Sequence, residues 1–550
     1  MTGYCGQKMD KPLKEMGMRQ ANRTSVLIVL MAAILALGGM AIAKSGFYLG
    51  KHEGDTLHMV EIVSRMAAGQ LPHIDFMTPI GALAFAPIAL FKANGFGIGM
   101  SVLWAQVLMA LAFVLPTFWV AISRFPRLLA APYGFVVMVL ILALVHGEAE
   151  SGVSISMHYN RWAWAAAYVA IPAALFVPQF ARNSLFDGII IGLMLSVMAM
   201  IKVTYFVAFA PVIVVALLMT GQLRAFGIAI LTGLGVVAIL TAGMGIGFWL
   251  AYVADLQTVA GSANRAAPGL PLASILAAPA YEGGTIAAIA GVIFLRRAGA
   301  NAAGMGLLLL IPGFIYVTYQ NFGNDPQWLL LMAFILLAHR PDQGDERATI
   351  TGIALMSIAF ATPSFLNLAY SPFRHFNADV ERFTPLISGT PDNADLYTLT
   401  ARAIRVDATV ALDTEGQPYA KWQDQSGRDA PVSFKGETFG NCALDSGITA
   451  YFTDVSSDLT EVGYQGAKLF TADLLNSFWL YGEFEPLTGG APWYYGGLSG
   501  FADAEYLLVP LCPLSVEARE LILTEITETG ADTTLTEVRR TPLYVLFEKG

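Results

Sequence analysis

Residues 51–75 concentrate titratable side chains directly after the first apolar segment of the chain. They are Lys51, His52, Glu53, Asp55, His58, Glu61, Arg65, His73 and Asp75, and they include three of the seven histidines. A carboxylate held beside a hydroxyl group can act as a general base and make the hydroxyl oxygen a better nucleophile. We therefore predict that an acidic residue in this stretch is catalytic, with Asp55 as the first candidate.

Further polar residues follow later apolar segments that are predicted to end on the same face of a membrane. They are His146, Glu148, Glu150, His158, Arg161, Lys202, Gln320, Asn321, Asn324 and Asp325. Lys202 has apolar neighbours on both sides, where a lysine is costly unless it reaches the interface or pairs with an anion.

A phosphate-containing substrate fits these residue types. The cationic candidates for holding the phosphate oxygens are Lys202, Arg161 and His158. The candidates for contacting the rest of the substrate are His73, Asp75, Asn324 and Asp325. A phosphate leaving group needs charge stabilisation and no general acid, so one base and one cationic site suffice for sugar transfer from a polyprenyl phosphate.

Each of these residues also has a simple structural explanation. Asp55 can cap the N-terminus of a helix. Glu61 and Arg65 can form an exposed i, i+4 pair, which is worth only about 0.2–0.5 kcal/mol. His73 and Asp75 lie in the sequence LPHIDF, where a proline-containing surface turn accounts for both. The later polar residues can simply lie in solvated loops.

The composition indicates a polytopic α-helical membrane protein. The 550 residues are 55% hydrophobic and 13% charged, whereas soluble domains carry about 25% charged residues. Apolar runs long enough to cross a bilayer as helices continue to about residue 370. We predict eleven spans, at 25–46, 98–122, 128–146, 161–180, 185–201, 204–220, 225–250, 273–295, 303–319, 327–339 and 348–367. The net charge of -9 comes without a basic stripe, which excludes nucleic-acid binding.

Arginines and lysines set the predicted orientation. Five precede the first span, and the others that follow alternate spans are Arg124, Arg127, Arg182, Arg224, Arg296, Arg297, Arg340 and Arg347. The positive-inside rule therefore places the N-terminus in the cytoplasm and, with eleven spans, the C-terminus outside. We predict that the protein lies in an inner membrane. It would have a cytoplasmic tail at 1–24, a transmembrane domain at 25–370 with a structured external loop at 48–97, and a periplasmic domain at 371–550. A cleavable signal peptide ending in AIAK is the alternative for the first segment.

The first external loop is predicted to contain two helical segments. Apolar residues recur with helical spacing between 56 and 68, which predicts an amphipathic helix on the membrane surface. Gly69 and Pro72 are expected to end this helix. Residues 80–92 are too short to cross a bilayer and predict an interfacial or re-entrant helix.

Residues 371–550 are predicted to form a soluble α/β domain. The runs DATVALD, AEYLLVPLC and LYVLFEKG predict strands, SVEARELILTEITETG predicts a helix, and TGGAPWYYGGLSGF at 488–501 predicts an exposed aromatic loop. Cys442 and Cys512 can pair if this domain is external. Two separate buried thiols are an equally good explanation.

The region around Asp55 resembles the GT-C superfamily of membrane glycosyltransferases, in particular bacterial members similar to protein O-mannosyltransferases and lipid A aminoarabinose transferases. The matching features are a first span, Asp55 opening the helix TLHMVEIVSRMAAG, and then Leu71, Pro72, Asp75 and Phe76. The resemblance covers about 370 residues by topology and this loop alone by motif.

This resemblance implies an inverting transfer from a polyprenyl-phosphate sugar to a cell-envelope glycan, lipid or protein, with Asp55 as the catalytic base. Relatives often have adjacent Asp and Glu; here Asp55 is followed by Thr56, and Glu53 is the nearby second acid and second catalytic candidate. Lys202 lies where relatives often have a basic residue after the fifth span. Many such enzymes need no metal, and the His and Glu residues lack a recognised metal spacing. We therefore predict no cofactor, with a divalent metal as the alternative.

Two other functions remain as alternatives. A transporter or flippase of a lipid-linked or small polar substrate would be expected to show inverted repeats and polar residues near the membrane midplane. Here the charges cluster at one face and no repeat is visible. The other alternative is an inactive scaffold whose external domain binds a cell-wall partner.

Overall fold

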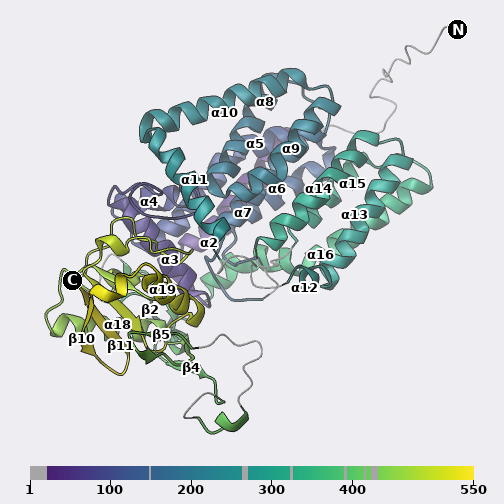
Figure 1. Ribbon diagram of the computed structural model, residues 1–550. Coiled ribbons are helices and arrows are strands. Elements are labelled where there is room, and N and C mark those ends of the chain that lie inside the picture. The colour runs from purple at the N-terminus through teal and green to yellow at the C-terminus, as the bar shows by residue number, and fades with distance from the viewer. Residues whose placement is uncertain are drawn as a thin grey trace.

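The computed structural model describes residues 21–147, 150–262, 271–321, 326–388, 393–413, 417–422 and 431–550. Helices form the N-terminal part, and a smaller part that contains the strands lies at one end of them (Figure 1). The helix α3 (Glu53–Ala67) lies where the two parts meet.

Six helical segments in the described ranges are long and apolar enough to cross a membrane. They are Arg23–Ile42, α5 (Ile98–Arg124), α8 (Ser184–Ile201), α10 (Leu223–Met244), α14 (Asn301–Tyr319) and α16 (Asp345–Phe376). The first segment consists of α1 (Arg23–Ala33), the π-helical turn η2 (Ile34–Gly38) and α2 (Gly39–Ile42). The helices that accompany them are α6 (Arg127–Leu142), α7 (His158–Leu175), α9 (Val203–Met219), α13 (Pro279–Arg297) and α15 (Trp328–His339).

Each of the eleven predicted segments contains a helix, but two of them are interrupted. Residues 225–250 divide at Gly245, whose φ of 80° ends α10 and begins α11 (Ile246–Gly261). Residues 273–295 begin with α12 (Leu272–Leu276) before α13. In addition, α16 continues to Phe376, so the helical part extends beyond the predicted boundary at 370.

The helix predicted over 56–68 is present, but it is covered by protein on most of its surface, and its place on the membrane surface stays a prediction. Ten of the fifteen residues of α3 are buried, because the C-terminal part covers the side that the apolar helices do not. The short segment predicted over 80–92 is also present, as η3 (Ala82–Ala84) and α4 (Ala86–Ala93).

The C-terminal part is built on a mixed sheet, which agrees with the predicted mixture of strands and helices. Its strands are β8 (Leu469–Thr471), β9 (Tyr506–Pro510), β10 (Leu535–Arg540) and β11 (Tyr544–Lys549), in the order β10-β11-β9-β8. β8 runs parallel to β9, and the other neighbours are antiparallel. The predicted helix is α19 (Val516–Glu528), and α18 (Ile448–Glu461) precedes the sheet.

A small three-stranded sheet fastens the two parts together. β1 (Phe47–Leu49), which follows the first helical segment, pairs in parallel with β3 (Leu396–Leu399). β3 also pairs with β2 (Phe383–Pro385) in the antiparallel sense. The start of the first loop is therefore part of a sheet whose other strands come from the C-terminal part.

A disulfide answers the question that the sequence left open about the cysteines. β4 (Asp407–Val410) pairs with β7 (Cys442–Ser446), and beyond them β5 (Ser433–Phe434) pairs with β6 (Glu437–Thr438). Cys442 is bonded to Cys512, with 4.7 Å between their Cα atoms. The bond ties β7 to the segment that follows β9.

Candidate functional site

Asp55 lies inside the first turn of α3, so its predicted role as the capping residue is wrong. The helix begins two residues earlier, at Glu53, because His52 adopts a left-handed conformation with a φ of 65° and turns the chain into the helix. Asp55 is half-buried, and within the described part of the chain its carboxylate makes no hydrogen bond or ion pair. The carboxylate is therefore available to an incoming group.

Glu53, the second acidic candidate, is instead engaged by the C-terminal part. Its carboxylate accepts hydrogen bonds from Thr398 Oγ1 at 2.9 Å and from Arg402 Nε and Nη2 at 2.6 and 2.8 Å. Burial raises the pKa of Glu53, but the hydrogen bonds and charge of Arg402 outweigh burial and hold the pKa below its usual value. A carboxylate stabilised in this way is a weak base, and its contacts position α3 against β3.

Lys202 lies at the junction between α8 and α9, where one extended residue separates the two helices. Its Nζ donates hydrogen bonds to Asn160 Oδ1, at 3.2 Å, and to Asn321 Oδ1. The same ammonium lies 5.6 Å from the centre of the Tyr159 ring. A cation is thus held at a helix junction, with amide oxygens and an aromatic face among its partners.

Gly81 brings the first loop onto this junction. Its backbone N–H donates to the carbonyl of Ile201 at 3.0 Å. A Cβ atom at position 81 would lie 2.1 Å from the carbonyl oxygen of Met200, far inside van der Waals contact, so only glycine allows this approach. The turn before α4 therefore sits directly beside Lys202.

A small polar cavity lies next to Lys202. Its lining residues come from the segment after α6, from α7, α9 and α14, and from Asn321 and Gln327, which lie between α14 and α15. They are His146, Gly147, Asn160, Arg161, Trp164, Tyr205, Thr318, Asn321 and Gln327. Its volume of about 20 Å³ is enough for about one water molecule. A sugar cannot fit there, so a substrate of that size must lie outside this cavity.

Arg161 and His158 bind backbone carbonyls. Arg161 donates from Nη1 to Val145 O and from Nη2 to Ala143 O, both at 2.6 Å, and so satisfies carbonyls of the segment that follows α6. His158 Nε2 lies 2.8 Å from the carbonyl oxygen of Ala84. Both side chains are buried. They hold the walls of the site in place, and Arg161 also lines the cavity.

His73 and Asp75 stabilise the loop after α3. His73 Nδ1 lies 2.9 Å from Asp255 Oδ2 of α11, and the same oxygen accepts the N–H of Thr78 at 3.1 Å. Asp75 Oδ2 accepts the N–H of Leu71 at 2.6 Å. The other predicted contact residues, Asn324 and Asp325, lie outside the described residues, as does Glu148.

Aromatic residues from the C-terminal part and from the turn before α4 pack on α3 one turn after Asp55. The centre of the His58 ring lies 5.4 Å from that of Trp493, 6.0 Å from that of Tyr495 and 6.4 Å from that of Phe85. Tyr494, Tyr495 and Phe501 are all buried, so the prediction that 488–501 is an exposed aromatic loop is wrong for these residues.

Two chains of contacts join the start of α3 to the surroundings of Lys202. On one side, the ring centres of His52 and His146 are 5.1 Å apart, and His146 lines the cavity. On the other side, His58 contacts Phe85, whose ring centre is 6.1 Å from that of Tyr159, the residue under the Lys202 ammonium. Asp55 lies between His52 and His58 in sequence, one turn from each.

Sequence reasoning missed two polar residues of the site, Asn160 and Tyr205. Asn160 holds Lys202, and the hydroxyl of Tyr205 accepts a hydrogen bond from Asn321 Nδ2 at 3.2 Å. A signal was present, because Tyr205 lies in the first turn of the helix that begins directly after Lys202, and its N–H donates to the carbonyl of Lys202 at 3.0 Å.

Neither groups of metal-binding side chains nor comparisons with known proteins indicate the chemistry of the site. Across the described ranges, no group of three or more His, Cys, Asp or Glu side chains is arranged to hold a metal ion. No protein family, curated protein or solved structure matches this chain.

Proposed function

We propose that this protein is a membrane glycosyltransferase that moves a sugar from a polyprenyl-phosphate donor to a hydroxyl group of a cell-envelope acceptor. The observation that carries the proposal is the Asp55 carboxylate, which is half-buried and unengaged within the described residues. The neighbouring acids Glu53 and Glu61 are both bound by arginines.

In the proposed reaction, Asp55 takes the proton of the acceptor hydroxyl as its oxygen attacks the anomeric carbon of the sugar. The bond between this carbon and the phosphate oxygen breaks, and the phosphate leaves with the electron pair. The Lys202 ammonium stabilises the charge that develops on the phosphate oxygens. Attack from the side opposite the leaving group inverts the configuration at the anomeric carbon.

The proposed location is an inner membrane, with the N-terminus in the cytoplasm and the C-terminal part in the periplasm. Six apolar helices support a membrane protein, and the Cys442–Cys512 disulfide supports an oxidising compartment for the C-terminal part. Arg124, which contributes to the predicted orientation, is buried against Asp187 at 2.7 Å. The orientation therefore depends more on the remaining arginines.

Mass spectrometry of cell-envelope glycans and glycolipids tests the proposal in three strains, which carry the wild-type protein, no protein, or Asp55→Asn. Under the proposal, one glycosylated species disappears in both altered strains, while Asp55→Asn protein remains folded in the membrane. Asp345→Asn is the matched control, since Asp345 also lies in the first turn of a helix but is exposed. An unchanged glycan profile in the strain without the protein would contradict glycosyl transfer and favour a transporter or scaffold. A normal profile with Asp55→Asn would contradict the role of Asp55 alone.

A further inference from the structure

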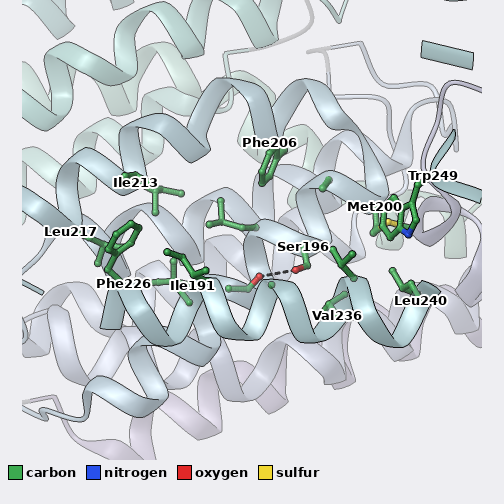
Figure 2. Close-up of a pocket in the computed structure, with 18 residues that line it drawn as sticks. Ile191, Ser196, Met200, Phe206, Ile213, Leu217, Phe226, Val236, Leu240 and Trp249 are labelled. Atoms are coloured by element: carbon green, nitrogen blue, oxygen red, sulfur yellow. Dashed lines mark hydrogen bonds between the residues drawn. The ribbon is translucent and has the colours of Figure 1, made fainter. Parts of the chain in front are cut away.

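An apolar groove runs along the helical part between α9 and α10, with α8 as its floor. Figure 2 shows its lining side chains, which include Ile213 of α9, Val236 of α10 and Trp249 of α11. Its volume is about 270 Å³. The Ser196 hydroxyl in the lining donates to the carbonyl of Gly192 at 2.9 Å, so this hydroxyl requires no polar ligand.

The groove exists because α10 packs closely on α8 and stays apart from α9. Cβ atoms at Gly188 and Gly192 of α8 would lie 2.6 and 2.5 Å from the carbonyl oxygens of Ala225 and Ala229 of α10. Ala225 and Ala229 are the buried residues of α10, whereas Ile230 and Val237, which line the groove, are 47% and 44% exposed. The side of α10 toward α9 therefore has apolar surface without a protein partner along the groove.

We propose that this groove binds one acyl chain of a bilayer phospholipid. The groove-lining residues of α10 extend from Phe226 to Leu240, which is about 21 Å of helix at 1.5 Å per residue. This length exceeds half of the ~30 Å hydrocarbon core, the depth that an acyl chain of one leaflet occupies. The chain would complete the packing between α9 and α10, which the side chains leave open.

The position of the groove separates it from the proposed donor site. Met200 lines the groove, and Lys202 follows two residues later. The Lys202 ammonium, however, is held by Asn160 of α7 and by Asn321 after α14, whereas the groove opens between α9 and α10. A phosphate bound to Lys202 thus lies toward α7, so the groove is assigned to a structural lipid and not to the carrier chain.

The inference rests on the membrane placement in the proposed function, and it is independent of glycosyl transfer. The test uses full-length protein purified in detergent and stripped of lipid, with palmitoyl-oleoyl phosphatidylglycerol as the probe and native mass spectrometry as the readout. Gly233→Leu fills the groove, since Gly233 lines it. Gly235→Leu is the control, because position 235 lies outside the lining and, as at 233, no atom lies within 4 Å of its added Cβ.

Wild-type protein, Gly235→Leu and Asp55→Asn are expected to retain one more phosphatidylglycerol molecule than Gly233→Leu. A second pair, Val237→Phe in the groove and Ile239→Phe outside it, gives the same contrast if Gly233→Leu does not fold. Equal retention by both members of a folded pair would overturn the proposal. Displacement of the retained lipid by an equimolar polyprenyl phosphate would also overturn it, because the groove would then belong to the carrier.

Discussion

The buried pair of Glu61 and Arg65 offers the sharpest test of how α3 is held. Arg65 Nη2 lies 3.2 Å from Glu61 Oε1, and the two side chains are 2% and 0% exposed. The prediction of an exposed pair is therefore wrong. Glu61 also accepts a hydrogen bond from Ser477 Oγ at 3.0 Å, and Arg65 donates to the carbonyl of Leu487 at 3.0 Å. The pair thus joins α3 to the C-terminal part.

The substitution Arg65→Met keeps most of the apolar stem and leaves the Glu61 carboxylate buried without its cation. At 3.2 Å and an effective dielectric constant of 20, the lost attraction is roughly 5 kcal/mol. Breaking one side of a buried pair typically costs about 3–5 kcal/mol. We expect a loss of that size in the free energy of unfolding at pH 8.

The loss should depend on pH with a defined sign. Burial already raises the pKa of Glu61 against the opposing charge of Arg65, and removal of Arg65 raises this pKa further. A carboxyl group whose pKa is raised in the folded state contributes stability below the unfolded pKa of about 4.3 and loses it as the pH rises through the folded pKa. The free energy of unfolding of Arg65→Met should therefore approach that of the wild type near pH 5 and fall by up to about 1.4 kcal/mol per pH unit above it.

The assay is thermal unfolding in detergent, followed by intrinsic fluorescence, at pH 5, 6, 7 and 8. The double variant Glu61→Gln, Arg65→Met is the control, because it removes the titrating group together with its partner. The reasoning would be refuted if the midpoint difference between Arg65→Met and wild type were the same at every pH. A pH dependence of the double variant equal to that of the single variant would refute it as well.

Three further outcomes are expected. Burial raises the pKa of Asp473 to about 6, so wild-type stability should fall by roughly 3 kcal/mol as the pH rises from 4 to 7, and thermal melts of Asp473→Asn should lack this fall. Gly81→Ala should lower both the thermal midpoint and glycan transfer, because the added Cβ meets a backbone carbonyl. Gly39→Ala should leave both measurements near the wild-type values, because no atom lies within 4 Å of a Cβ added at position 39. Replacing Cys442 and Cys512, which are 70 residues apart, by serine should cost about 4 kcal/mol, and reductant should then no longer change the melting curve.

The sequence was sufficient for elements whose determinants are local. Apolar runs predicted the positions of the helices. A run of about 20 apolar residues is typical of a membrane-crossing helix, whichever segments pack beside it. The helix α19 was predictable from SVEARELILTEITETG, and Ser515 caps it by accepting the N–H of Ala518 at 3.2 Å.

Elements whose surroundings come from distant residues could not be predicted. The polar side of α3 has the same sequence pattern whether it contacts water or a second domain with matching polar groups. The burial of Glu61 could therefore not be predicted, because its partner Ser477 lies 416 residues away. Similarly, nothing near Glu53 in sequence indicates Arg402 as its partner. The role of Asp55 as catalytic base remains a prediction, although its place in the first turn of α3 leaves the carboxylate available.

The sheet formed by β1, β2 and β3 has a consequence for the order in which the chain assembles. The hydrogen bond between Glu53 and Thr398 cannot form until Thr398 has been synthesised, 345 residues after Glu53. At about 5–20 residues per second, this delay is on the order of 20–70 s. Throughout that time the first loop, although among the earliest segments to be synthesised, has two acidic groups without their final partners and one strand without its neighbour. The first loop is therefore expected to be among the last parts to fold. A chain whose synthesis stops after α16 would be inserted in the membrane but would lack the residues that complete the site.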